Sequence, residues 1–153
     1  MICANCGGKI HYKKPCSDCG IEYMDMLKGI THPEMKRIFK RMEKIQSEHG
    51  DLNLETSLMA CELVNSSLIV ACRLGDEGLE IVFLPGPKGR QFIALCTDMD
   101  EYGKCFDDLI PMTNPWKHVL DLLTEDVEGF VINPLGECCF IGRGLLDEYF
   151  LND

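Results

Sequence analysis

Two Cys-x-x-Cys pairs near the N-terminus constrain the fold of this chain more than any other feature. Cys3 and Cys6 form the first pair, nine residues follow, and Cys16 and Cys19 form the second. A Cys-x-x-Cys turn directs two thiolates at one ion, and four thiolates complete the tetrahedral shell of Zn²⁺ at about 2.3 Å. The spacing therefore predicts one zinc ion bound by Cys3, Cys6, Cys16 and Cys19.

The residues around the cysteines support this metal site. A glycine follows each pair, at Gly7 and Gly20, and glycine adopts the positive φ of a tight turn at little cost. Residues 9–14 between the pairs are expected to form a short hairpin. So short a segment cannot build a core alone, so metal binding should supply its folding energy. A closed four-sulfur shell leaves no position for water or substrate, so a structural zinc is predicted.

Two alternatives compete with this interpretation. The same four cysteines fit two redox-active thiol pairs or two disulfides, although the doubled spacing with its glycines favours a metal. His11 is a fifth candidate ligand. Because four thiolates already fill a tetrahedron, His11 is expected on the hairpin surface.

The other six cysteines lack paired spacing and lie in apolar stretches, so most of them are expected to be buried thiols. They are Cys61, Cys72, Cys96, Cys105, Cys138 and Cys139. Cys138 and Cys139 are adjacent, and a strand would point them to opposite faces. The start of the sequence predicts no signal peptide, and no run of about 18 apolar residues is present. These features favour a reducing cytoplasmic location, where disulfides are rare.

Composition and charge narrow the functional classes. The 153 residues are 46% apolar, which suits one ordinary domain with a small appendage. The net charge of -10 argues against binding nucleic acid or anionic membrane through bulk charge. Residues 1–49 carry nine Lys/Arg and six Asp/Glu, whereas residues 50–153 carry six and nineteen. The basic residues therefore concentrate before residue 50.

Much of this basic charge belongs to one predicted amphipathic helix over residues 33–48. Its apolar residues recur at helical spacing, Pro33 suits the first turn, and His49-Gly50 ends it. The opposite face is basic, and is expected either to be solvated or to dock on acidic residues of this chain or a neighbour. The basic residues are Lys36, Arg37, Lys40, Arg41 and Lys44.

The remaining periodicity predicts an α+β fold: a mixed, largely antiparallel sheet of about five strands with flanking helices, plus a small N-terminal zinc ribbon. Leu54, Leu58, Cys61 and Leu63-Val64 suggest a helix before the sheet. Strands are expected at 68–74, 79–84, 91–97, 129–132 and 137–141, the first three as a meander, and further helices at 98–106, 115–124 and 144–150. The predicted division is a zinc-ribbon-like module over 1–24, a linker and amphipathic helix over 25–50, and a main domain over 51–153.

Two short motifs in the main domain have clear local structure. Thr97 or Asp98 can cap the following helix, with Glu101 placed for a capping box. Asn133-Pro134-Leu135-Gly136 predicts a turn that pairs its flanking strands, with glycine tolerating a positive φ. Trp116, the single tryptophan, starts an apolar helix and is expected as a core or interface anchor.

Together with Asn114-Pro115-Trp116, these motifs resemble the SseB (enhanced serine sensitivity) N-terminal domain family over about residues 52–150. That family typically has a strand that runs into a Thr-Asp helix start and a later strand that ends in Asn-Pro. Such domains are compact α+β modules without an established enzymatic activity. The resemblance therefore implies a binding or regulatory role, to which the N-terminal zinc module is an addition.

The sequence favours a non-enzymatic zinc-binding interaction or regulatory protein with a protein partner and no membrane contact. No nucleotide-binding glycine loop or nucleophile motif occurs, so no catalytic or organic cofactor-binding residues are predicted. A nucleic-acid-associated factor is the alternative, because Lys9, Lys13 and Lys14 surround Tyr12. An uncharacterised enzyme is the third possibility.

Overall fold

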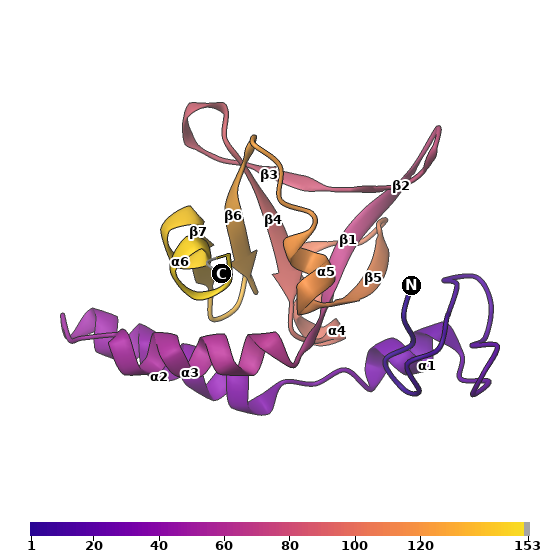
Figure 1. The fold of residues 1–153 in the computed structure, drawn as a ribbon, viewed down its shortest axis with the longest axis horizontal. Coiled ribbons are helices and arrows are strands. Elements are labelled where there is room, and N and C mark those ends of the chain that lie inside the picture. Colours follow the sequence, from indigo (N-terminus) through magenta and orange to yellow (C-terminus); the bar gives the residue numbers. More distant parts are fainter. Residues whose placement is uncertain (152–153) are drawn as a thin grey trace.

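The computed structural model describes residues 1–151. Three helices precede the first strand, and strands and short helices follow (Figure 1). They are α1 (Tyr23–Lys28), α2 (Pro33–Ser47), α3 (Asn53–Val64), β1 (Ser67–Gly75), β2 (Gly78–Ile81), β3 (Phe83–Pro85), the short 3-10 helix η1 (Pro87–Gly89), β4 (Gln91–Cys96), α4 (Met99–Cys105), β5 (Ile110–Pro115), α5 (Trp116–Leu120), β6 (Val127–Ile132), β7 (Cys139–Gly142) and α6 (Arg143–Tyr149).

The strands form one mixed sheet, which confirms the α+β prediction. Five strands lie in the order β2-β1-β4-β6-β7, while β3 pairs with β4 and β5 pairs with β1. The pairing of β4 with β6 is parallel, and every other pairing in this sheet is antiparallel. The segment that connects β4 to β6 contains α4, β5 and α5.

The described part of the chain has seven strands, whereas about five were predicted. The expected strand at 79–84 divides into β2 and β3, because it pairs first with β1 and then with β4. The remaining extra strand, β5, was not predicted. It contains Pro111 and Pro115, which cannot donate to a sheet and are tolerated at an edge. Its register with β1 runs from Ser67 opposite Pro115 to Cys72 opposite Ile110.

Each face of the sheet packs against its own hydrophobic core. One core joins the sheet to α2, α3, α5 and α6, through side chains such as Phe39, Met59 and Trp116. The other joins the opposite face to α1, α4 and the cysteine-rich N-terminus, through side chains such as Leu27 and Ile69. The N-terminal segment and α2 therefore both pack against the sheet.

Helix α2 begins at the predicted residue, ends one residue before the predicted end, and has the predicted two faces. Met35, Ile38 and Phe39 are buried in the core that α2 shares with the sheet. On the basic face, Lys36 Nζ lies 3.0 Å from Asp98 Oδ2 and Arg41 Nε lies 3.0 Å from Glu55 Oε2. The basic residues thus dock partly on acidic residues of the same chain, one of the two arrangements expected from the sequence.

Helix α3 is present, but the apolar residues that predicted it are mostly exposed. Leu54 is 67% exposed and Val64 is 57% exposed, and Leu58 and Cys61 are also exposed. The buried face consists of Met59, Ala60 and Leu63 with the polar Glu55 and Thr56. Helix α3 carries apolar side chains on both its buried and its exposed sides, so hydrophobic periodicity predicted the helix but not which face is buried.

The two short motifs of the main domain contact each other at the ends of the parallel strands. Asn133 is fully buried, and its Oδ1 accepts from the Thr97 amide at 3.0 Å while its Nδ2 donates to Thr97 Oγ1 at 3.0 Å. Asn133 has φ 52, so the positive φ of this turn lies at Asn133 and not at Gly136. Strands β6 and β7 pair antiparallel on either side, as predicted.

Replacing Asn133 by alanine is expected to destabilise the fold by about 3 kcal/mol. The substitution leaves the buried Thr97 amide without a partner. It also places alanine at a positive φ, which asparagine tolerates better because its polar side chain can form local hydrogen bonds. Urea unfolding of the two proteins measures the difference. Asn65→Ala, at an exposed helix end, is the matched control and should change the free energy of unfolding by less than about 0.5 kcal/mol. Equal stabilities for both variants would contradict this assignment.

Candidate metal centre

The four cysteines of the predicted site converge in the structure. The sulfur atoms of Cys3, Cys6, Cys16 and Cys19 all lie within 4.8 Å of one another. Cys3 Sγ is 3.8 Å from Cys19 Sγ, and Cys6 Sγ is 3.6 Å from Cys16 Sγ. A tetrahedron with metal–sulfur distances of about 2.3 Å has edges of about 3.8 Å. The cluster therefore has the size of a four-thiolate metal site.

The backbone around each pair repeats the same turn. Gly7 has φ 80 and Gly20 has φ 76, which confirms the positive φ expected after each Cys-x-x-Cys pair. The Gly7 amide donates to the Cys3 carbonyl at 2.8 Å, and the Gly20 amide donates to the Cys16 carbonyl at 2.9 Å. Both turns aim two sulfurs inward, and a side chain at either glycine would be conformationally strained.

The segment between the two cysteine pairs forms a shorter turn than the hairpin that was expected over residues 9–14. One bridge joins Ile2 to Lys9 and frames the first turn, and another joins His11 to Lys14. The His11 ring is exposed and stacks on Tyr12 with ring centroids 4.7 Å apart. His11 is not among the converging side chains, which agrees with its expected place on the surface.

Hydrogen bonds to sulfur distinguish the individual thiols. Asn5 Nδ2 donates to Cys19 Sγ at 3.3 Å, and this bond is the main reason that the pKa of Cys19 falls to about 6. The Gly8 amide lowers the pKa of Cys6, but the neighbouring sulfurs, Cys19 first, outweigh it and raise that pKa to about 12. In the metal-free cluster the Cys19 thiol is therefore more acidic than the Cys6 thiol.

Burial divides the cluster into an inner and an outer half. Cys3 and Cys16 are 1% and 2% exposed and belong to the core on this face of the sheet. Cys6 and Cys19 are exposed. A bound ion would thus connect the packed interior to the surface turns. All four sulfurs are needed to close the shell, so no coordination position remains for a substrate.

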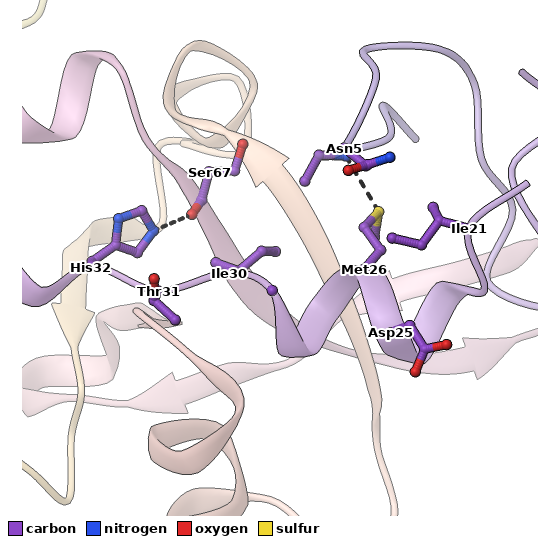
Figure 2. A pocket seen from close by; sticks show the side chains of 10 residues that line it. Asn5, Ile21, Asp25, Met26, Ile30, Thr31, His32 and Ser67 are labelled. Carbon is purple, nitrogen blue, oxygen red and sulfur yellow. Dashed lines mark hydrogen bonds between the residues drawn. The ribbon is translucent and has the colours of Figure 1, made fainter. Parts of the chain in front are cut away.

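A small cavity of about 240 Å³ lies beside the metal centre. Figure 2 shows Asn5 and Met26 on one side of it and Thr31, His32 and Ser67 on the other. His32 Nε2 lies 2.7 Å from the Ser67 carbonyl oxygen, so this nitrogen carries the proton that it donates. Asn5 both lines this cavity and contacts a ligand sulfur. Sequence reasoning missed Asn5, although its place inside the first Cys-x-x-Cys pair was a signal.

The other six cysteines are less uniformly buried than expected. Cys72, Cys96 and Cys139 are buried, Cys105 is half-buried, and Cys61 and Cys138 are exposed. Cys138 and Cys139 differ in exposure, as expected for neighbouring residues on opposite sides of the chain. Within residues 1–151, none of these six belongs to a group that could hold a metal ion.

Comparisons with protein-family models, curated proteins and solved structures find no match to this chain. Within the described residues, no helix has the length and apolar character needed to cross a membrane.

Elemental analysis of the purified chain is expected to find about one tightly bound metal ion per molecule, because one four-thiolate shell binds one ion. Cys3→Ser should lower this content by at least about tenfold, since it removes an inner ligand. Cys61→Ser changes an exposed cysteine outside the cluster and should leave the content unchanged. Equal metal content in the wild type and Cys3→Ser would show that the cluster does not hold the ion.

Proposed function

We propose that this chain is a zinc-binding interaction protein without an enzymatic activity of its own. The observation that carries the proposal is the place of the four-sulfur cluster, whose inner half belongs to a core shared with the sheet. Four thiolates at tetrahedral spacing favour zinc among the common cellular metals. A metal ion whose four coordination positions are all filled by thiolates stabilises the surrounding fold, and it has no open position at which to activate a substrate.

A protein partner is supported by apolar side chains that the fold leaves exposed. Leu54 and Val64 on α3 are 67% and 57% exposed, and Leu135 and Phe140 around β7 are 66% and 57% exposed. Exposed apolar side chains that gather on one surface mark binding sites for other proteins. Four exposed side chains on α3 are spaced three or four residues apart and therefore form one stripe along the helix: Leu54, Leu58, Cys61 and Val64.

The main domain is proposed to be SseB-like. The motifs behind that resemblance contact each other, since Asn133 holds both the amide and the hydroxyl of Thr97. This contact explains physically why a Thr-Asp helix start and an Asn-Pro turn would occur together in one domain. A cytoplasmic location is proposed with it, supported by ten cysteines of which none is in a disulfide within residues 1–151.

A nucleic-acid-binding role is the second candidate, and one contact favours it. Lys13 Nζ lies 5.5 Å from the centroid of the Tyr12 ring, and Lys9 and Lys14 are exposed nearby. Basic and aromatic side chains in this arrangement can contact a phosphate backbone and a stacked base. The remainder of the chain is acidic, which opposes such binding.

One set of measurements tests the proposed function. The full chain, purified with its metal, should contain zinc, and should retain one protein in stoichiometric amount from the native cell extract after chemical crosslinking. Leu54→Ser with Val64→Ser should abolish retention if the α3 stripe is the contact, while Lys44→Ser on the exposed surface of α2 should not. Recovery of background proteins alone would contradict a protein-binding role.

The nucleic-acid alternative predicts different results. In that case the chain would bind single-stranded DNA or RNA with an affinity that falls steeply with salt, and Lys13→Gln with Lys14→Gln would weaken it at least about tenfold. We expect instead no measurable binding at physiological salt. Tight, salt-dependent binding lost in the double variant would replace the protein-partner proposal.

A further inference from the structure

A second cavity, which shares no lining residue with the four-cysteine cluster, lies beyond the carboxyl ends of the parallel strands β4 and β6. It has a volume of about 320 Å³ and is lined by Pro33, Lys36, Arg37, Lys40, Glu101 and Glu137. Three elements meet here: the first half of α2, helix α4, which follows β4, and the turn between β6 and β7. Ligands of open α/β sheets bind at this end of parallel strands.

Two carboxylates of this cavity have an oxygen without a hydrogen-bond partner in the described residues. The Glu101 side chain is 6% exposed, and its Oε1 is paired with Lys104 at 2.9 Å and Lys36 at 3.4 Å. Its Oε2 is buried and unpaired, as is Oε2 of Glu137. An unpartnered buried acceptor is costly, so both oxygens call for a donor that this part of the chain does not supply.

A glycine makes room for the buried carboxylate. A Cβ at Gly136 would lie 2.3 Å from Glu101 Oε2, so a side chain at this position would force the carboxylate to move. Glu101 Oε2 therefore occupies the space that a side chain at residue 136 would take. The glycine at position 136 thus leaves space for the Glu101 carboxylate. It is not needed for a positive φ, because the residue with a positive φ in this turn is Asn133.

The rim of the same cavity has hydrogen-bond donors that remain free. Lys40 Nζ is 3.5 Å from Glu137 Oε1, and the Lys40 side chain is 71% exposed. Arg37 pairs with Glu34 through one guanidinium nitrogen. An ammonium group has three N–H donors and a guanidinium has five, so both cations can bind a further anion. A lone metal ion does not suit this site, because cations line it on the α2 side.

We propose that this cavity binds a small zwitterion, a molecule with a primary amine and an anionic group, of which a free α-amino acid is the simplest kind. The ammonium of the ligand pairs with the carboxylates of Glu101 and Glu137, which line the cavity. Its carboxylate accepts from Lys40 and Arg37 at the rim. The volume of about 320 Å³ lies at the lower end for small-molecule pockets. The site shares no residue with the metal centre, so the two proposals fail independently.

Calorimetric titration of the full, metal-loaded chain with each free L-amino acid of proteins, up to about 10 mM, tests the inference. At least one amino acid is expected to bind. Its analogue without the amine and its analogue without the carboxylate should each bind at least about tenfold more weakly, because each loses a charged hydrogen bond. Equal binding by the carboxylate-only analogue would reveal a plain anion site and overturn the proposal.

Three variants locate the binding. Glu137→Gln removes the charge of a partly exposed acceptor, and Lys40→Met removes an exposed donor, so each is expected to fold and to weaken binding at least about tenfold. Lys44→Met, one turn further along α2 and not in the cavity lining, is the matched control and should bind as the wild type does. Unchanged affinity in both cavity variants, or no binding by any amino acid, would overturn the proposal.

Discussion

The central strands β1 and β4 carry buried apolar side chains on both faces, so this sheet is stable only when both faces are covered. Leu68, Val70, Ile93 and Leu95 face one core, whereas Ile69, Ala71 and Cys96 face the other. Helices α2, α3, α5 and α6 cover the first face. The second face is covered by α1, α4 and the cysteine-rich N-terminus, which alone is too short to hold a fold without a metal.

Because of this constraint, a metal ion held by the four cysteines would stabilise the whole fold. Cys3 and Cys16 belong both to the group that could hold a metal ion and to the core on this face of the sheet. Fixing their sulfurs around one ion therefore also fixes the cover over β1 and β4. On the basic face of α2, Arg41 forms an ion pair with Glu55 of α3. On the same face, Lys36 forms an ion pair with Asp98 at the start of α4. Helix α2 thus positions both the first core and the charged cavity.

Local signals in the sequence were sufficient to predict the cysteine turns, α2 and the pairing of strands that are neighbours in the chain. Each of these features depends on residues that lie close together in the sequence. Strand β5 was missed because Pro111 and Pro115 oppose strand propensity, and pairing with β1 outweighs them. The buried face of α3 was missed because Glu55 is buried there by its contact with Arg41. The charged cavity joins Lys36, Glu101 and Glu137, which only the folded chain brings together.

Thiol labelling followed by mass spectrometry tests most directly whether the metal-bound N-terminus covers the sheet. Cys96 lies under this cover and Cys139 lies in the other core, and both are buried. After removal of the metal with a chelator, Cys96 is expected to react much faster than in the metal-loaded protein, and faster than Cys139 in the same sample. Protection of Cys96 that is unchanged without the metal would contradict the account.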